Sequence, residues 1–310
     1  MQLKQTITGK ITRSFVKYPY RETEGYIEIH RPVKVTDPLL SIVIPTIDKM
    51  REGYLPALLS QVDQQTFRNF EVLLVIKDTR QGRAINSGVA LASGKYIVIL
   101  DDDTRLGTNY ILEKMVESME LHPEIGMAGV ANLVPDDASW FVRRVMRELP
   151  RRTSPIVHEI TESDLAEHPC CIIPRDVFIK IGGENEIIPR GLDPYLRREI
   201  RQAGYRVVVL PELFIHHLPP GSFKKFVRQF YRNGKMAAYV NKFYPEFVVE
   251  LAYQHEAEVK QKRSLIVRII SYCARVIKTI LTLRFFYLMS SLLYLMGFVI
   301  GYLTLKKSDV

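Results

Sequence analysis

Three consecutive carboxylates, Asp101, Asp102 and Asp103, directly follow the apolar run from Tyr96 to Leu100. Such a run predicts a buried strand, and open α/β sheets bind ligands at the carboxyl ends of their strands. Because side chains alternate along a strand, we expect Asp101 and Asp103 to point one way and Asp102 the other. Two oxygen ligands on one side suit Mg²⁺ or Mn²⁺, which would bridge a diphosphate. The alternative is an acidic turn in which one aspartate caps the next helix.

The elements that must position this triplet precede it in the chain. Residues 39–46 and 70–76 predict buried strands, and 54–64 predicts a helix because apolar residues recur there at helical spacing. A second helix is expected to begin at Gly82. Strand–helix repeats of this length indicate βαβ units with right-handed crossovers. The sequence therefore predicts an α/β fold with a Rossmann-like, mostly parallel sheet.

Five short motifs occur in the order and spacing of one known family. They are Ser41-Ile-Val-Ile-Pro-Thr46, Asn69-Phe-Glu-Val-Leu-Leu-Val75, Gly82-Arg-Ala-Ile-Asn-Ser-Gly88, Ala92-Ser-Gly-Lys-Tyr-Ile97 and Leu100-Asp-Asp-Asp103. In these motifs the chain resembles the family 2 glycosyltransferases, which have the GT-A fold. The resemblance implies an enzyme that takes a sugar from a UDP- or GDP-sugar with Mn²⁺ or Mg²⁺ as cofactor.

The resemblance also implies which residues contact the nucleotide-sugar. These are Pro45, Thr46, Asp48, Asp78, Arg83, Asn86, Asp101, Asp102 and Arg232. Asp101 and Asp103 would hold the metal ion together with His217, a position that matches a family histidine when counted from Pro211. The chain departs from the family after the second strand, where Asp78 stands in Ile-Lys-Asp-Thr instead of Asp-Asp-Gly-Ser. The aspartate that contacts the base is thus displaced or replaced.

Asp193 is the candidate catalytic residue of the second half. Counted back from Ala203-Gly204-Tyr205, it falls on the aspartate of the family's Glu-Asp pair, which is the general base, while Leu192 replaces the glutamate. The alternative makes Asp193 a helix N-cap with Pro194 at the first helical position, and both roles can hold at once.

Two aromatic–basic segments complete the second half. Residues 223–234, which include Arg232, resemble a family segment whose cations would neutralise the diphosphate; a solvated helix face is the alternative. Residues 138–147 predict a helix or lid. There Trp140 is expected to pack rather than to stack on a sugar.

The net charge of +9 is concentrated in the tail, because residues 260–310 contain nine Lys or Arg and one acid. This location argues against a nucleic-acid partner and favours membrane lipids. The run 285–305 has 21 residues without a charge, enough to span a hydrocarbon core of about 30 Å. Residues 264–283 predict an interfacial amphipathic helix whose polar face carries Arg268, Ser271, Arg275, Lys278 and Thr282. A single span and a helical hairpin that returns the C-terminus both remain open.

These patterns divide the chain into an N-terminal extension (1–38), a catalytic domain (39–255) and C-terminal membrane helices (256–310). Within the catalytic domain, 39–130 is the nucleotide-sugar half and 131–255 the acceptor half. The three cysteines lack metal spacing and predict reduced thiols. If the last helix crosses the cell membrane once, the basic residues upstream of it predict a cytoplasmic catalytic domain.

The predicted function is inverting, metal-dependent sugar transfer from a nucleotide-diphosphate sugar to a lipid-linked glycan or polysaccharide acceptor. One alternative is a polyprenyl- or dolichyl-phosphate sugar synthase. An alternative of another class is a non-catalytic, membrane-tethered protein that binds nucleotide-sugars. The sequence is also compatible with a homo-oligomer.

Overall fold

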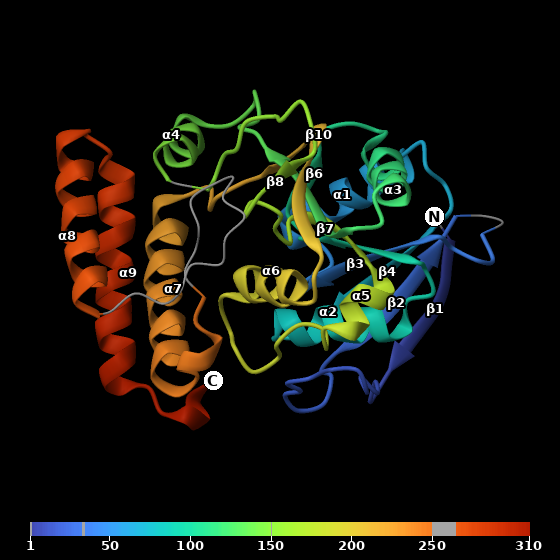
Figure 1. Cartoon of the computed structure of the whole chain (residues 1–310), viewed down its shortest axis with the longest axis horizontal. Coiled ribbons are helices and arrows are strands. Elements are labelled where there is room, and N and C mark those ends of the chain that lie inside the picture. The colour runs from blue at the N-terminus through green and yellow to red at the C-terminus, as the bar shows by residue number, and fades with distance from the viewer. Residues whose placement is uncertain (1, 33–34, 150, 250–264) are drawn as a thin grey trace.

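The computed structural model describes residues 2–32, 35–149, 151–249 and 265–310. A twisted sheet forms its centre, helices cover both faces of the sheet, and the long C-terminal helices stand together at one end (Figure 1). The predicted α/β class is confirmed.

The sheet runs in the order β1-β2-β4-β3-β5-β9-β7-β10-β6, with β8 paired to β10. Its strands are β1 (Gln2–Thr8), β2 (Tyr26–Arg31), β3 (Leu40–Thr46), β4 (Phe70–Ile76), β5 (Tyr96–Leu100), β6 (Thr104–Leu106), β7 (Ile125–Asn132), β8 (Thr161–Glu162), β9 (Cys170–Pro174) and β10 (Arg206–His217). The strands β1 and β2 pair with each other and then with β4, so the N-terminal residues belong to the same sheet.

The sheet is mixed rather than mostly parallel, which corrects the sequence-based prediction of its strand directions. Parallel pairing joins β3 to β4, β3 to β5 and β7 to β10. Between β5 and β7, however, β9 runs antiparallel to both. A buried strand reads as the same apolar run in either direction, so composition alone could not reveal this reversal.

The helices are α1 (Tyr54–Asp63), α2 (Gln81–Leu91), α3 (Ile111–Leu121), α4 (Trp140–Glu148), α5 (Arg175–Lys180), α6 (Leu192–Gln202), α7 (Phe223–Phe243), α8 (Leu265–Leu281) and α9 (Phe285–Thr304). Alternate residues of the central strands face opposite layers, as their period of two requires. Ile42 of β3 packs in the layer that includes α1 and α3, whereas Val43 packs in the layer that includes α2 and α6. The central strands are therefore buried on both faces, and their carboxyl ends are held rigidly.

The C-terminal part forms a separate layer of helices, in which α9 contacts both α7 and α8 (Figure 1). Among the described residues, α9 is the one helix long and apolar enough to cross a membrane by length and composition. The side chains of Arg268 and Arg275, which the amphipathic pattern of α8 included, lie outside the described residues. Cys170 and Cys171 are unpaired thiols, as predicted; the Cys273 side chain lies outside the described set.

Candidate active site

Asp101, Asp103 and His217 come together at the end of β5. The Nε2 atom of His217 lies 3.3 Å from Asp103 Oδ1 and 3.9 Å from Asp101 Oδ2. Single ligand atoms of the three residues all lie within 4.8 Å of one another, so one metal ion could contact them all. The three residues expected to hold the metal ion therefore form one cluster.

Strand pairing explains why a histidine so far along the chain reaches the triplet. The short strand β6 follows the triplet directly and runs antiparallel to β10, with Thr104 opposite His217. Asn132, at the end of β7, accepts a hydrogen bond from the His217 backbone N–H at 2.9 Å. The backbone of His217 is thus fixed from both neighbouring strands.

The charges of this cluster shift each other's protonation. Burial raises the pKa of Asp101 to about 6, with His217 opposing the shift and Asp103 adding to it. Burial would also raise the pKa of Asp103, but the hydrogen bond and charge of His217 lower it overall. The pKa of His217 is raised: burial opposes the rise, and the bond to Asp103 outweighs it. Two partly buried carboxylates this close together favour a cation between them.

The donor set fits a divalent metal ion such as Mn²⁺ or Mg²⁺. Carboxylate oxygens suit both ions, and an imidazole nitrogen is also a ligand for first-row transition metals. The side chains of Asp101, Asp103 and His217 remain 20%, 25% and 20% exposed, so an ion and a diphosphate could reach them from the cavity described below.

Asp102 points away from this cluster, as the alternation along the strand predicted. Its carboxylate accepts a hydrogen bond from the Thr46 hydroxyl at 2.7 Å and from Arg51 Nε at 2.9 Å. Arg51 also lies 3.3 Å from Asp103. Asp102 thereby ties the ends of β3 and β5 together and brings a cation beside the metal ligands. No motif in the sequence distinguished Arg51.

Asp193 lies in the first turn of α6, directly after a tight turn. The N-cap is Gly191 in a left-handed conformation (φ 88°), so the alternative in which Asp193 is the N-cap does not hold. Asp193 Oδ1 instead accepts a hydrogen bond from the His168 backbone N–H at 2.8 Å and lies 3.3 Å from His168 Nδ1. Its carboxylate is therefore held by the segment before β9.

His168 connects Asp193 to a second carboxylate, that of Glu184, 2.7 Å from its Nε2 atom. Burial would lower the pKa of His168, but Asp193 and Glu184 outweigh it and raise the pKa to about 10. Burial likewise opposes the shift of Asp193, yet the His168 imidazolium and Arg197 lower the pKa of Asp193. Asp193 is thus kept ionised, as a proton acceptor must be. Sequence reasoning did not identify His168, because a single histidine without a motif carries no signal.

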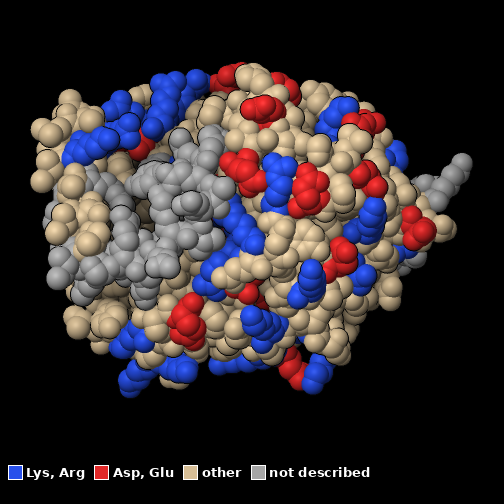
Figure 2. Space-filling view, in the orientation of Figure 1, with Lys and Arg blue, Asp and Glu red and all other residues tan. Residues whose placement is uncertain are grey.

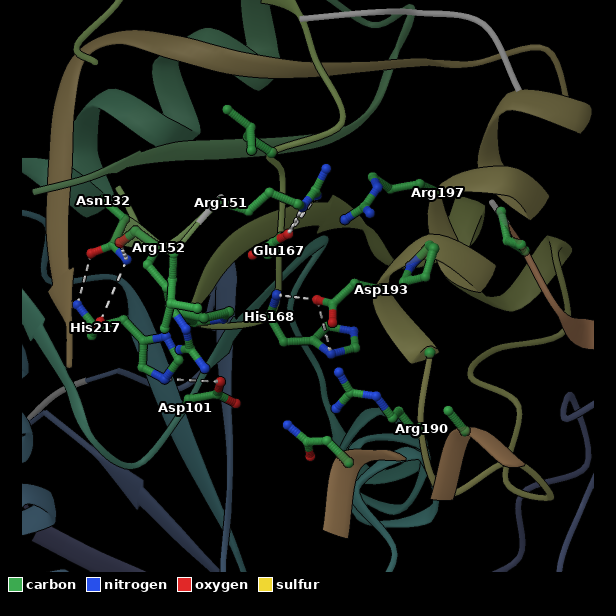
Figure 3. A pocket seen from close by; sticks show the side chains of 18 of the residues that line it. Asp101, Asn132, Arg151, Arg152, Glu167, His168, Arg190, Asp193, Arg197 and His217 are labelled. Atoms are coloured by element: carbon green, nitrogen blue, oxygen red, sulfur yellow. Dashed lines mark hydrogen bonds and ion pairs between the residues drawn. The ribbon is translucent and has the colours of Figure 1, made fainter. Parts of the chain in front are cut away.

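A cavity of about 670 Å³ joins the two halves of the site (Figure 3). Asp101 and His217 line it on one side and Asp193 on another. Arg152 points into it from the His217 side and Arg190 from the Asp193 side (Figure 3). The wall also includes residues of the C-terminal helices, among them Tyr287, Ser290, Ser291 and Tyr294 of α9. The structure thus brings metal-ligand and base candidates together in one space.

Asp78 and Arg83, expected to contact the nucleotide, instead face each other in the protein interior. Arg83 is fully buried, and its Nε and Nη2 atoms each lie 3.0 Å from an Asp78 oxygen. Glu24 of the N-terminal segment pairs with the same guanidinium at 2.9 Å, and the Tyr20 carbonyl accepts from it at 3.2 Å. Neither Asp78 nor Arg83 lines the cavity.

Asn86 is also buried and serves the framework of the site. Its amide nitrogen donates to the Glu184 carbonyl at 2.9 Å, and its side-chain oxygen accepts from the Glu184 backbone N–H at 2.8 Å. Gly183 has φ 65° and packs against this amide, where a Cβ would lie 2.6 Å from Asn86 Oδ1. The motif of α2 therefore positions Glu184, which in turn contacts His168.

The remaining predicted site residues lie around these groups. Pro45 is the penultimate residue of β3, and the Asp48 carbonyl accepts from the Thr46 hydroxyl at 2.9 Å. Arg232 is exposed on α7 and does not line the cavity, although its neighbour Asn233 does. Trp140 is 72% exposed, and its ring makes a T-shaped contact with the ring of Phe286, with the two centroids 6.2 Å apart.

Comparisons with known proteins show which proteins this chain is similar to. The model of Glycosyl transferase family 2 matches residues 75–182, which hold the α2 motif and the aspartate triplet. An uncharacterized glycosyltransferase of Haemophilus influenzae is 26% identical over 183 residues, an alignment that covers 51% of this chain and 60% of that protein.

Solved structures give the fold. The mannosyltransferase PcManGT from Pyrobaculum calidifontis, in complex with GDP-Man and Mn²⁺, superposes with a TM-score of 0.53 at 14% identity over 87% of this chain and 90% of its own. S. aureus TarS 1–349 in complex with UDP-GlcNAc has a TM-score of 0.45 at 13% identity, with 65% of this chain and 66% of that chain covered. Residues 75–182 are therefore similar to the family 2 glycosyltransferases, and the chain shares the overall fold of the Pyrobaculum mannosyltransferase, as the predicted GT-A-like architecture requires.

Proposed function

We propose that this protein is an inverting glycosyltransferase that moves a sugar from a nucleotide-diphosphate sugar to a lipid-linked glycan or polysaccharide at the cytoplasmic face of the membrane. The single observation that carries this proposal is the shared cavity, in which Asp101 and His217 face the same space as Asp193. A donor held at the metal cluster and an acceptor held at Asp193 would therefore meet within one site.

Asp193 acts as the general base in this proposal. It removes the proton from the acceptor hydroxyl, whose oxygen forms the new bond to the anomeric carbon. The bond from that carbon to the diphosphate oxygen breaks, and its electron pair leaves with the nucleoside diphosphate. One displacement inverts the anomeric centre, so no protein nucleophile is required.

The neighbouring residues keep these groups in place. His168 holds the Asp193 carboxylate by its backbone N–H and, as an imidazolium, favours the ionised form. Asp101, Asp103 and His217 would hold Mn²⁺ or Mg²⁺, which supplies positive charge to the leaving diphosphate when bound. Arg51, paired with Asp102, adds a fixed cation beside them.

The position of α9 supports an acceptor that arrives from lipid. Tyr287, Ser290 and Tyr294 of this helix line the same cavity as Asp193. Arg190 lies beside Asp193 in the cavity and interacts with the Tyr294 hydroxyl. An acceptor anchored in the membrane beside α9 would reach Asp193 directly.

A metal-dependent donor assay tests the proposed activity. We expect Mn²⁺ or Mg²⁺ to support slow hydrolysis of one UDP- or GDP-sugar, and chelation to stop it. Asp103→Asn should lose this activity, whereas Asp136→Asn, on an exposed loop, should keep it. Absence of hydrolysis with every common donor, while donor binding persists, would favour the non-catalytic binding protein instead.

A second acceptor class is favoured by two guanidinium groups in the cavity. Arg152 and Arg190 both line it, and neither forms an ion pair within the parts of the chain that the structure describes. Arginines that face a shared space without a carboxylate partner suit a phosphate, which they bind through paired hydrogen bonds. The phosphate of a polyprenyl or dolichyl acceptor would meet this requirement.

Competition between acceptors separates the two classes. A polyprenyl phosphate and a lipid-linked saccharide are offered together with the labelled donor, and the products are resolved. Label in the saccharide supports the glycan-extending activity; label only in the lipid phosphate supports the synthase. In the latter case Asp193→Asn should retain most of the activity, because a phosphate oxygen attacks without losing a proton.

A further inference from the structure

The N-terminal end of α9 is fixed to the catalytic domain. The backbone N–H groups of Phe286 and Tyr287 donate to the Glu148 carboxylate at 2.6 and 3.3 Å. Glu148 ends α4 and is 5% exposed, so this carboxylate caps α9 from the interior of the protein. Such a cap satisfies backbone donors that the first turn leaves unpaired and complements the helix dipole.

The C-terminal end of α9 is fixed to the same domain. Leu305 is 6% exposed and packs in a cluster with Tyr195 of α6 and Tyr239 of α7. The Tyr239 hydroxyl donates to the Lys307 carbonyl at 2.9 Å, and Tyr20 donates to the Val310 carbonyl at 3.0 Å. The last residues of the chain therefore lie against the N-terminal segment and α6.

Between its ends, α9 lies in close contact with α7 (Figure 1). Glycines allow this approach on both helices: a Cβ added at Gly234 would collide with the Tyr294 carbonyl, and one added at Gly297 with the Tyr231 carbonyl. An α-helix of 20 residues is about 30 Å long, so α9 extends along most of its partner helix. The helix rests lengthwise on the domain instead of projecting from it.

The charges of α7 decide whether α9 can cross a bilayer. Lysine and arginine occur along the whole of α7, at Lys224, Lys225, Arg228, Arg232, Lys235 and Lys242. Because the two helices pack along their lengths, immersing α9 would carry these cations toward the hydrocarbon, where each is costly. It would also break the contacts at both ends of α9.

We propose that α8 and α9 form a monotopic membrane anchor, which lies flat on an anionic bilayer and leaves the C-terminus on the side of the catalytic domain. This inference concerns docking alone and stands apart from the proposed transfer reaction. The hydropathy of α9 would also permit a single crossing of the membrane. The inference favours a helix pair that does not cross it.

The exposed surface of the helix pair fits this partner. The turn from α8 to α9 exposes Leu281 (78%), Leu283 (79%) and Phe285 (61%), and the outer face of α9 exposes further apolar residues. Exposed cations accompany them, namely Arg147, Lys224, Lys278 and Arg284. Lys and Arg gather along the edge where α4 and the α8–α9 turn lie (Figure 2). Apolar residues beside cations are the pattern that inserts at the level of lipid phosphates.

Vesicle flotation with two matched variants tests the docking surface. The full-length protein is mixed with vesicles of phosphatidylcholine alone or with added phosphatidylglycerol. We expect binding mainly to the anionic vesicles. Leu281→Glu should weaken this binding at least about tenfold, because the variant loses the insertion of one leucine and gains a negative charge that anionic lipids repel. The control Leu121→Glu, 75% exposed at the end of α3, should bind as the wild type does. Thermal unfolding of both variants verifies that they fold.

The side on which the C-terminus lies is tested by cysteine labelling. Ser308→Cys and Glu117→Cys are made separately in a Cys273→Ser background and exposed in intact cells to a membrane-impermeant maleimide. We expect the two positions to label, or to be protected, together. Labelling of Ser308→Cys from the opposite side would overturn the monotopic arrangement.

In the flotation experiment, equal loss of vesicle binding in Leu281→Glu and Leu121→Glu would overturn the assigned docking surface.

A second copy of the chain is the competing occupant of the apolar surface. The bilayer is not the partner if the protein binds neither kind of vesicle and instead forms a dimer that Leu281→Glu dissociates. Sedimentation of the wild type and both leucine variants gives that result without reference to the enzymatic activity.

Discussion

Two arginine environments in this molecule differ in a way that separates framework from chemistry. Arg83 is fully buried and surrounded by Asp78, Glu24 and the Tyr20 carbonyl. Arg152 and Arg190 line the open cavity and have no carboxylate partner within the described parts of the chain. The same side chain thus stabilises the fold in one place and remains available to a ligand in the other.

The difference shows why resemblance to a family locates a site better than it assigns roles within it. Arg83 and Asn86 belong to the most recognisable motif, yet both are turned inward. The groups that face the cavity include Arg190 and His168, which belong to no motif. Variants of the paired region should therefore change stability, and variants of the cavity should change activity.

The largest effect is expected for Asp101→Asn, which removes one of the proposed metal ligands. Activity should fall at least about 100-fold, since changes around a metal site commonly cost this much. Stability should rise instead. The pKa of Asp101 is raised to about 6 in the folded state, so the ionised group opposes folding at neutral pH by about 1–3 kcal/mol, and this penalty disappears as the pH falls below 4. Transfer assays and thermal unfolding without metal check both parts.

Arg83→Met should produce the opposite pattern. Loss of this cation leaves Asp78 buried without its partner, which commonly costs about 3–5 kcal/mol. The double variant with Asp78→Asn should recover part of that loss, because no unpaired charge remains. As the matched variant, Arg190→Met should change the free energy of unfolding by less than about 1 kcal/mol. Equal destabilisation by the two methionine variants would contradict the proposed division.

Arg190→Gln should weaken binding of the acceptor. If Arg190 binds an acceptor phosphate, KM for the lipid acceptor should rise about 10-fold or more, while metal-dependent donor hydrolysis stays unchanged. Steady-state kinetics with both substrates varied gives the two parameters. An increase confined to KM for the donor would assign Arg190 to the diphosphate instead.

A further effect is expected in the pH dependence of stability. His168 has a folded pKa of about 10 against 6.5 in the unfolded chain, so its contribution is complete below pH 6.5 and is lost as the pH rises toward 10. We expect the free energy of unfolding to fall across this interval in the wild type and less steeply in His168→Gln. Denaturant unfolding at several pH values measures both slopes. Parallel slopes would mean that His168 is not protonated in the folded protein.

Local pattern predicted the elements well because each has a strong physical signature. The apolar runs of β3, β4 and β5 and the helical spacing of α1 are visible in the sequence, and the family motifs marked the end of β5 correctly. Strand direction was not predictable, since β9 is apolar in the same way as β5 and β7, to which it runs antiparallel.

The site was predictable only where chemistry and motif coincide. Asp101, Asp103 and His217 were expected together and are together. The residues that hold Asp193 in place were not predicted, because His168 and Glu184 reach it through contacts between segments that are distant in the sequence. Burial of Arg83 could not be foreseen either, since it depends on the N-terminal segment folding over α2.

The central claim is that Asp193 and the metal cluster act on one substrate pair across the shared cavity. Parallel measurement of donor affinity and sugar transfer in Asp193→Asn tests it most directly. We predict that the Kd for the nucleotide-sugar with Mn²⁺ changes less than about threefold, whereas transfer to a hydroxyl acceptor falls by about 10²–10⁴. Full transfer activity, or a loss confined to donor binding, would contradict the assignment of Asp193 as the base.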